Sequence, residues 1–512
     1  MQGETKQAGG AAGQEAAAET KESLLVSIFE RIDIAAPKTG VDVGEFKDAA
    51  SVAEKPRGAM VAAALKVFID AIGQLDKPVD RIDKTLLDSL VASIDAKLSV
   101  QLDEILHHEK FQQLESAWRG LRFLVDRTDF RRNVRIEMLD VSKEALRQSF
   151  EDAPELTLSG LYKHIYTGAY DQPGADPYGA MITNYEFDSS AQDIALLQNV
   201  SKVAASAHCP FVGSAGPRFF GKKSMEEWKK IPDLKAWMET SEYTKWRGFR
   251  ETEDSRYVGL TFPRFLLRLP YGPGAVEVKG FRYQENVRGP DHEKYLWGNS
   301  SFAFASNLVR AYVTDGWCVQ IRGPQAGGMV DNLNVHVYDV GKGKEVKIPT
   351  EVPIDETLEF ACSNLGFIPF SHYEGRDYAC FFSANAAQKP AEYDSPEANA
   401  NSRINARLPY IFLASRIAHY LKVLQRENIG TTKDRVRIEK ELNEWIRGLV
   451  TEMKNPTEEQ IAKHPLRAAQ VRVYDIEENP GFYRVEMMIM PHFQIEGMDI
   501  SLSLVGKMPK GK

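Results

Sequence analysis

Apolar residues recur with a helical period in the first third of the chain. They return every three or four positions across residues 60–72, across 85–108 and across 110–128. Because an α-helix turns once in 3.6 residues, this spacing puts the apolar side chains on one face. The third segment carries a continuous apolar stripe, which consists of Phe111, Leu114, Trp118, Leu121 and Val125. We therefore predict three helices here, and we expect Trp118 to pack in a core.

After residue 130 the pattern mixes extended with helical segments. Residues 133–141 alternate apolar and polar side chains, which predicts a strand, and residues 142–152 return to a helical pattern. Two further strand patterns, 181–188 and 209–216, flank a helical segment at 193–208. A parallel pair of strands needs a long crossover connection, so this order indicates an α/β unit with parallel strands.

Strand patterns and loops dominate residues 255–390, and the rest of the chain combines helices with strands. Helical patterns cover residues 408–428 and 435–453. Residues 471–493 contain two extended runs joined by the turn-like sequence ENPG. The last run, 497–507, alternates, and its apolar face consists of Met498, Ile500, Leu502 and Leu504. These patterns predict a multi-domain, mixed α/β (α+β) fold with a helical N-terminal region, a β-rich middle and C-terminal strands.

Composition divides the chain into six predicted segments. The 512 residues suggest two or three folded domains. The first residues are rich in Ala, Gly and Glu, so we expect them to be disordered. The predicted segments are a tail (1–21), an amphipathic helix (22–36), a linker (37–58), a helical region (59–150), a mixed α/β to β-rich middle domain (151–395) and C-terminal helices and strands (396–512).

The short helix after the tail poses a question of its own. One face carries the apolar side chains Leu24, Leu25, Ile28, Phe29 and Ile32, and Pro37 ends the pattern. About three helical turns are not stable alone in water, so this helix needs a surface to lie on. It either folds back onto its own domain or docks, on a flexible tether, in the groove of a partner.

Composition and charge narrow the class of protein. Hydrophobic residues make up 43% of the chain and charged residues 27%, values typical of a soluble globular protein. The net charge of −8 weakens a nucleic-acid-binding interpretation. The most apolar long window, 408–424, contains Arg416, His419 and Lys422, which disfavours insertion in a membrane. Four cysteines without CxxC spacing suggest neither a disulfide scaffold nor a zinc ribbon. We predict a cytoplasmic protein without cofactor or metal.

One glycine-rich stretch resembles a phosphate-binding loop. Residues 216–222 match the first positions of that motif, but Lys223 stands where the motif needs a Ser or Thr to bind Mg²⁺. The interior of the loop is bulky and contains Pro217, which has no N–H to offer a phosphate. We therefore expect no catalytic residues here, and the turn after a strand is the simpler interpretation.

Arg264 and Arg268 lie four residues apart in a largely apolar segment. Arginines are seldom buried unless they are paired, and arginine suits ion pairs in interfaces. We predict that these two residues form ion pairs between subunits or domains. The alternative is a strand at the surface with arginines along its edge.

Several segments together resemble one family, the large subunit of the type VI secretion contractile sheath (TssC/VipB/EvpB). They are LESAWRGLRFLVDRTDFRRNVRIEMLDVSKEAL, CPFVGSAGPRFFG, LTFPRFLLRLPYG, YLWGNSSFAFA, GWCVQIRG and LPYIFLASRIAHYLKVLQRENIG, and they occur in the same order as in the family. The likeness runs from about residue 60 to the C-terminus. Asn334 departs from it, since a proline is expected there.

The resemblance implies a structural protein and not an enzyme. Family members pair with a small sheath subunit (TssB/VipA), on which the region 59–150 is expected to pack. The pairs stack as hexameric rings into a helical tube around an inner tube of Hcp, on a baseplate. The sheath contracts to propel the inner tube, and a ClpV-type AAA+ ATPase then takes the contracted form apart.

The resemblance also suggests roles for both ends of the chain. Leu24, Leu25, Ile28, Phe29 and Ile32 are then expected to form the face that the ATPase recognises. Met498, Ile500, Leu502 and Leu504 are expected to add a strand to the sheet of a neighbouring subunit, unless that strand belongs to its own sheet. The alternatives to this function are a sheath protein of a phage-like injection system and a P-loop-like nucleotide hydrolase.

Overall fold

The computed structural model describes residues 84–476 and 483–492, except residues 274, 277, 279, 280, 340, 342, 452, 454 and 455. The predicted tail, the helix at 22–36, the linker, the helix at 60–72 and the strand at 497–507 lie outside these ranges. The chain divides into two units. The first contains residues 1–106 and 271–286, and the second contains residues 107–270 and 287–512.

In the first unit, the segment 271–286 packs against the helix α4 (Lys84–Leu106). The Tyr283 hydroxyl donates to Asp103 Oδ1 at 2.6 Å, and the Tyr283 side chain is buried. Glu285 accepts a hydrogen bond from the backbone N–H of Tyr271 at 2.9 Å, which closes the segment on itself. The predicted helix at 85–108 is thus confirmed.

The second unit begins with helices and helical turns. They are α5 (Glu109–Asp126), η2 (Phe130–Arg132), α6 (Lys143–Glu151), η3 (Leu156–Leu158), α7 (Gly160–Tyr162) and η4 (Lys163–Asp171). The predicted strand at 133–141 is wrong, because no strand forms there. Side chains hold this segment instead: Arg135 pairs with Asp176, and the Tyr185 hydroxyl donates to the Val141 carbonyl.

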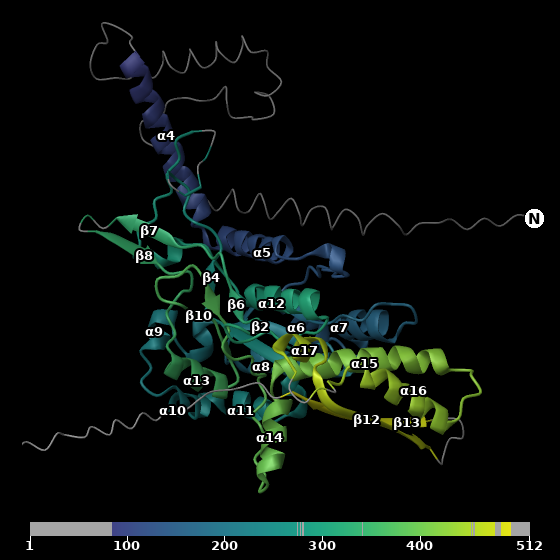
Figure 1. Ribbon diagram of the computed structural model, residues 1–512. Helices are drawn as coiled ribbons and strands as arrows, with labels where there is room; N and C mark the ends of the chain where they lie inside the picture. The colour runs from purple at the N-terminus through teal and green to yellow at the C-terminus, as the bar shows by residue number, and fades with distance from the viewer. Residues whose placement is uncertain are drawn as a thin grey trace, which may run out of the picture. The chain divides into compact units, whose positions relative to one another are not determined.

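The centre of the unit is a four-stranded parallel sheet in the order β1-β2-β3-β9. Its strand β2 is labelled in Figure 1. Its strands are β1 (Met181–Phe187), β2 (Phe211–Ala215), β3 (Val258–Phe262) and β9 (Ile368–Pro369). The helix α8 (Ala191–Ala207) connects β1 to β2, so the predicted strand–helix–strand unit is confirmed. β2 and β3 are buried along their whole length, as expected for a parallel sheet covered on both faces.

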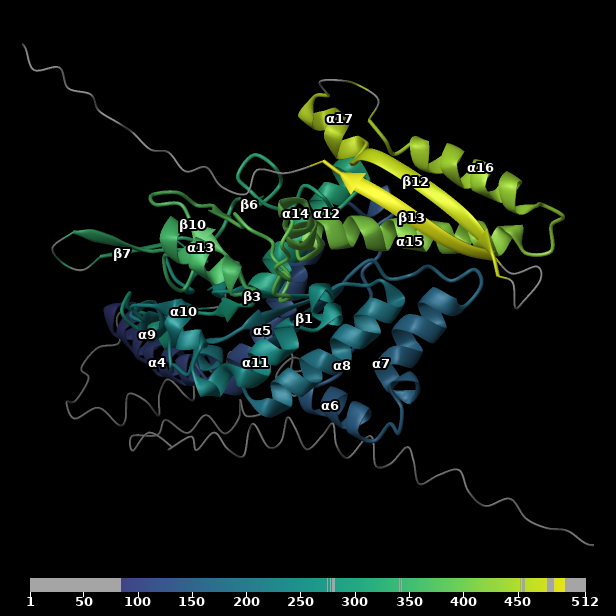
Figure 2. The same ribbon diagram turned by 90° about the horizontal axis from the view of Figure 1, so that it is seen from below.

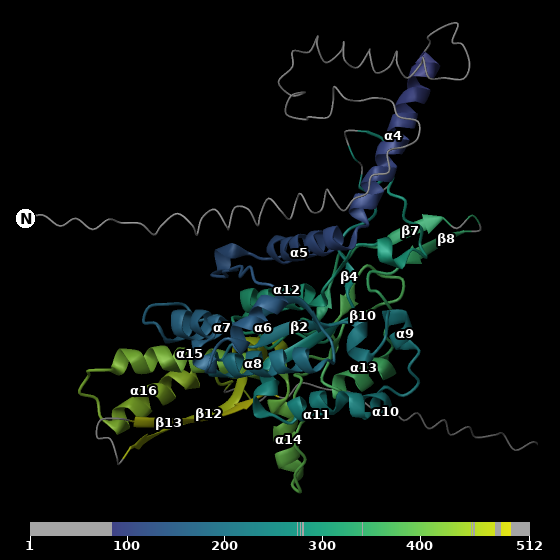
Figure 3. The ribbon, with the colours of Figure 1, turned by 180° about the vertical axis from the view of Figure 1, so that it is seen from behind.

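Helices cover the sheet on both sides. On one side, α8 lies beside α6 and α7 (Figure 3). The connection from β2 to β3 adds η5 (Pro217–Phe220), α9 (Met225–Lys229), α10 (Leu234–Met238), η6 (Ser241–Tyr243), α11 (Thr244–Arg250) and η7 (Glu253–Tyr257). The core on this side is aromatic, with the Phe219 and Trp246 rings 5.0 Å apart. The other side packs on α12 (Ser300–Asp315) and the start of α15 (Leu408–Asn428).

The region predicted to be β-rich forms only short strands joined by loops. They are β4 (Phe265–Leu266), β5 (Trp297–Gly298), β6 (Met329–Val330), β7 (His336–Asp339), β8 (Lys344–Lys347), β10 (Ser371–His372) and β11 (Ala379–Cys380). The helix α13 (Glu356–Asn364) and the turn η8 (His292–Lys294) lie between them in sequence.

The turn before β6 requires glycine at residue 327. Gly327 has a φ of 84°, and a side chain there would collide with the Gln320 carbonyl.

The C-terminal part places a β-hairpin over helices (Figure 2). Its elements are α14 (Pro396–Asn405), α15, α16 (Arg435–Arg447), α17 (Glu458–Lys463), β12 (Leu466–Asp475) and β13 (Tyr483–Pro491). β12 and β13 are antiparallel, and the predicted pair of strands is therefore confirmed. Val471 and Val473 of β12 are buried with Ile438, Leu442 and Ile446 of α16.

Candidate assembly surfaces

The predicted sites at the two ends of the chain lie outside the described residues. They are the helix face of Leu24, Leu25, Ile28, Phe29 and Ile32 and the strand face of Met498, Ile500, Leu502 and Leu504. Their roles stay predictions. Arg264 and Arg268 are described, and both form ion pairs with carboxylates of this chain.

Arg264 follows β3 and forms an ion pair with Glu351. Arg264 Nη2 lies 2.7 Å from Glu351 Oε1, and the Arg264 backbone N–H donates to Glu351 Oε2 at 3.0 Å. The Glu351 N–H donates in turn to the Arg264 carbonyl at 3.1 Å. The Glu351 side chain is only 2% exposed, whereas that of Arg264 is 37% exposed. The pair therefore fastens the end of β3 to the segment that precedes α13.

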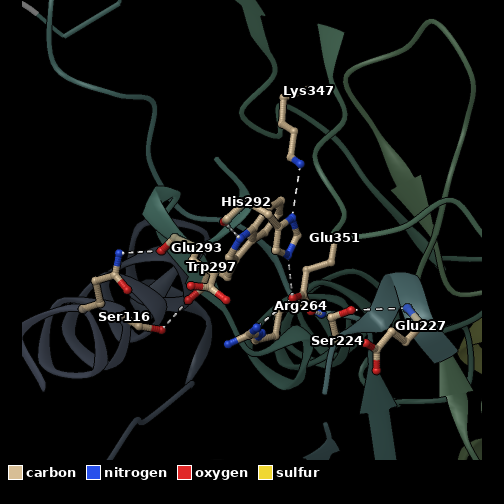
Figure 4. Close-up of polar contacts among 10 residues, drawn as sticks. Ser116, Ser224, Glu227, Arg264, His292, Glu293, Trp297, Lys347 and Glu351 are labelled. Carbon is tan, nitrogen blue, oxygen red and sulfur yellow. Dashed lines mark hydrogen bonds and ion pairs between the residues drawn. The ribbon is translucent and has the colours of Figure 1, made fainter. Parts of the chain in front are cut away.

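His292 and Lys347 extend this contact into a chain of polar groups (Figure 4). His292 Nε2 lies 3.3 Å from Glu351 Oε1, and His292 Nδ1 lies 3.2 Å from Lys347 Nζ. A lysine ammonium only donates, so Nδ1 accepts and Nε2 carries the proton that it donates to Glu351. The His292 ring also stacks on Trp297, with centroids 4.8 Å apart.

The charges around Glu351 keep it ionised. Burial alone would raise the pKa of Glu351, but Arg264 and the hydrogen bond from His292 outweigh it and lower that pKa to about 2. Burial lowers the pKa of Lys347 below its ordinary value. Desolvation opposes the charge of Arg264, yet Glu351 outweighs it and raises the pKa of Arg264. At neutral pH the pair is thus fully charged and held by several hydrogen bonds.

Arg268 belongs to a second, more buried ion pair. Its Nε lies 2.9 Å from Glu115 Oε1 of α5, and its side chain is only 5% exposed. Arg119 Nε approaches the same oxygen at 2.6 Å. On the same helix, the Ser116 hydroxyl donates to the Trp297 carbonyl at 2.8 Å. Arg264 and Arg268 therefore bind different partners on the two sides of β4, and their predicted part in contacts between subunits or domains stays a prediction.

α5 turns part of the predicted apolar stripe outward, so the expectation that Trp118 packs in a core is wrong. Trp118 is 57% exposed and Leu114 is 55% exposed. The helix instead packs through Gly120 and Leu124 against Phe302 of α12. A side chain at Gly120 would lie 2.5 Å from the Phe302 ring, so glycine permits this close approach. The outward stripe consists of Leu114, Trp118 and Val125, an apolar surface for which the described residues provide no cover, whereas Leu121 packs beside Leu124.

The phosphate-loop candidate forms a closed turn. The N–H groups of Phe219, Gly221 and Lys222 donate to carbonyl groups within residues 216–218. The Lys222 ammonium lies 4.1 Å from the centre of the Trp237 ring. Phe219 and Phe220 are buried in the core. The turn thus offers neither the free N–H groups nor the free lysine with which a P-loop holds phosphate.

The described ranges hold neither a metal-binding cluster nor a membrane span. No group of three or more His, Cys, Asp and Glu side chains there is arranged to hold a metal ion. None of the helices in these ranges has the length and apolar character needed to cross a bilayer. The cysteines are free thiols, and Cys209, Cys362 and Cys380 are buried.

Two family models match the chain. The model of the EvpB/VC_A0108 tail sheath N-terminal domain matches residues 88–388. The model of the EvpB/VC_A0108 tail sheath gpW/gp25-like domain matches residues 397–508. The chain is also 42% identical over 430 residues to the type VI secretion system sheath protein TssC1 of Pseudomonas aeruginosa, which covers 83% of this chain and 86% of that protein.

Solved structures of contractile systems are more distant. The chain is similar to a chain of the anti-feeding prophage baseplate, with a TM-score of 0.37 and 11% identity, over 73% of this chain and 83% of that one. For the contracted sheath of an extracellular contractile injection system the TM-score is 0.34, at 11% identity, over 65% and 72%. The assignment to a family rests on the sequence matches.

Proposed function

Because this chain belongs to the EvpB/VC_A0108 tail sheath family and is a structural component of a contractile sheath, we propose that it is the large sheath subunit of a type VI secretion system. The observation that carries the proposal is the 42% identity to TssC1, which extends over most of both chains. A sheath protein of a phage-like injection system is the second candidate, and this identity favours the type VI assignment over it.

The proposed partner is a small sheath subunit. The outward stripe on α5 supports this, because Trp118 and Leu114 place a large apolar area on the surface of a helix. Aromatic side chains of this kind are typical anchors of protein interfaces. The pairs of subunits form hexameric rings, stack on a baseplate and enclose an inner tube of Hcp. The protein works in the cytoplasm.

The N-terminal helix is the proposed recognition site for a ClpV-type ATPase. The predicted helix is too short to be stable in water unless its apolar face lies on another surface. The linker 37–58 gives it reach away from the helical region. The chain itself hydrolyses no nucleotide in this proposal, and the closed turn at Lys222 supports that.

The C-terminal strand 498–504 is proposed to pair with the sheet of a neighbouring subunit. Among the described residues β13 has no partner on its outer edge, which supports this, since a two-stranded sheet is marginal alone and gains from a further strand. Backbone hydrogen bonds along such a junction add up while the linker before it stays flexible. A sheath can thereby contract without losing its connections.

Electron microscopy tests the function directly. We expect tubes with a cogwheel-like cross-section in negative stain when the chain is co-expressed with a small sheath subunit. The same preparation should show no Mg²⁺-dependent binding or turnover of nucleotide. An isolated chain that never polymerises with the small subunit and hydrolyses nucleotide would contradict the proposal.

A further inference from the structure

Side chains of α16 occupy the edge of β12 that faces away from β13. Asn443 forms two hydrogen bonds with Val471: Nδ2 donates to the carbonyl at 2.7 Å, and Oδ1 accepts from the N–H at 3.0 Å. Glu439 Oε2 accepts from the Val473 N–H at 2.9 Å. Arg435 Nη1 donates to the Val473 carbonyl at 3.2 Å. Four backbone groups of this edge are therefore already bonded.

The three side chains belong to one row of the helix. Residues 435, 439 and 443 are spaced by four and so lie along one side of α16. The neighbouring row consists of Ile438, Leu442 and Ile446, which are buried against the hairpin. The buried row holds the polar row at the strand edge. The side-chain amide of Asn443 offers both an N–H donor and a carbonyl acceptor, as a paired residue of a strand does.

Backbone contacts close the start of the same edge. The Thr451 N–H donates to the Leu466 carbonyl at 2.9 Å, and the Leu466 N–H donates to the Leu449 carbonyl at 3.2 Å. A strand approaching β12 would have to displace these groups and the α16 row. Exposed strand edges pair readily with other chains, and proteins often protect them in such ways.

The outer edge of β13 differs. Val471 lies opposite Met487, and Val473 lies opposite Val485. The backbone N–H and C=O groups of Val471 and Val473 bond to α16, so these two residues form non-hydrogen-bonded pairs with Met487 and Val485. In such a pair both residues point their backbone groups away from the partner strand, so Met487 and Val485 point theirs to the outer edge of β13. Within residues 84–476 and 483–492, no third strand pairs with β13. Among the residues that the structure describes, one edge of the hairpin is thus closed and the other is open.

We propose that Arg435, Glu439 and Asn443 are an edge guard, which closes β12 to strand addition and directs a strand from a second copy of this chain to β13. The inference rests on the proposed strand exchange, since only a sheet that joins subunits needs one edge open and one closed. The occupant is the strand 498–504 of the second copy. A closed β12 prevents copies from joining in a second register that could not form a regular tube.

Hydrogen exchange on the full chain tests the guard itself. The guard variant Glu439→Leu/Asn443→Leu should exchange the amides of Val471 and Val473 at least tenfold faster than the wild type. The amide of Arg472, which points toward β13, should keep its rate. The matched control Lys440→Leu/Glu444→Leu makes the same changes on the exposed side of α16 and should behave as the wild type. Equal rates in guard variant and control overturn the proposal.

Cysteine pairs test where the strand docks. Chains with Ser501→Cys are mixed with chains carrying Arg472→Cys in β12 or Glu486→Cys in β13, two exposed residues that lie opposite each other. We expect disulfides to residue 486 only, and disulfides to residue 472 as well once the guard is removed. If removal opens no path to residue 472, the proposal is wrong.

The two experiments separate this inference from the proposed function. If no disulfide forms at either position, the proposed strand exchange between subunits is contradicted. The hydrogen-exchange rates of the Val471 and Val473 amides still decide whether the guard covers the edge of β12. If the double variant fails to fold, exchange rises throughout the core. The milder Asn443→Ala, which also removes both bonds to Val471, then decides: an unchanged Val471 amide overturns the guard.

Discussion

Glu351 receives hydrogen bonds from the backbone and the side chain of Arg264 and lies within reach of His292. These three residues are far apart in sequence, so nothing local indicates that they meet. The sequence predicted that Arg264 and Arg268 are paired, because buried arginines need partners. Their partners, Glu351 and Glu115, could not be chosen from among the many carboxylates, since only the fold brings them together.

At this scale, removal of Arg264 should destabilise the protein. Arg264→Leu leaves Glu351 buried without its main counter-charge, and breaking a buried pair costs about 3–5 kcal/mol. Because Arg264 is partly exposed, we expect about 2–3 kcal/mol, measured as a lower midpoint of thermal unfolding. Arg131→Leu, which breaks an exposed pair with Asp129, is the control and should shift the midpoint little. Equal shifts in both variants would contradict the structural role of Arg264.

His419 should make stability depend on pH. Burial, which outweighs a hydrogen bond to the Ala207 carbonyl, lowers the pKa of His419 to about 4. Above about pH 6.5 the ring is neutral in both folded and unfolded chains. Between about pH 6.5 and 4 only the unfolded chain gains the proton, so the free energy of unfolding falls, by about 3 kcal/mol in total.

Comparison with His419→Leu isolates this effect. Other groups with lowered pKa values, such as His372, remain in both proteins and cancel in the difference. We expect denaturant unfolding of the variant to lose less stability between pH 7 and pH 4 than that of the wild type. Parallel pH profiles would show that His419 has the same pKa in the folded and the unfolded chain, and would contradict this prediction.

At the scale of elements, periodicity predicted where helices lie but not which way they face. α15 covers residues 408–428, as its pattern indicates, and α8 connects two parallel strands as expected. α5 also forms where predicted, yet Leu114, Trp118 and Val125 of its stripe face outward. The side that packs is selected by Phe302, almost two hundred residues later, and by the small size of Gly120. Such distant contacts leave no trace in the local pattern.

The outward face of α5 leads to a binding prediction. Leu114→Asp/Trp118→Asp should abolish co-purification with the small sheath subunit, because charge replaces the apolar anchors of the interface. The unfolding midpoint of the chain alone should change little, since both side chains are already exposed. Gln113→Asp puts one such charge on an exposed position outside the stripe and serves as control. Undiminished co-purification of the double variant would rule out this surface.

The N-terminal helix makes a second prediction for an element. Leu25→Asp/Ile28→Asp should abolish binding of the N-terminal domain of a ClpV-type ATPase, because charges interrupt the apolar face. Sheath tubes should still assemble. Glu30→Asp, on the polar side of the same helix, should bind as the wild type does in a pull-down. Binding that survives the double substitution would show that the ATPase recognises another segment.

For the whole molecule, the question is how subunits stay joined while the sheath changes length. The α/β body is held by buried aromatic packing and by the two arginine pairs. In the proposed strand exchange, a C-terminal strand connects one body to the next, and its backbone hydrogen bonds would persist while the bodies shift against each other.

Removal of that strand should therefore separate pairing from polymerisation. Deletion of residues 498–512 should leave a soluble complex with the small subunit, because α5 and the described hairpin remain. It should prevent tubes, because copies lose the strand that joins them at β13. Negative-stain microscopy and size-exclusion chromatography of the co-expressed pair measure both effects. Deletion of residues 508–512 alone spares the alternating run and should preserve the tubes. Tubes that survive the longer deletion would place the connection between subunits elsewhere in the chain.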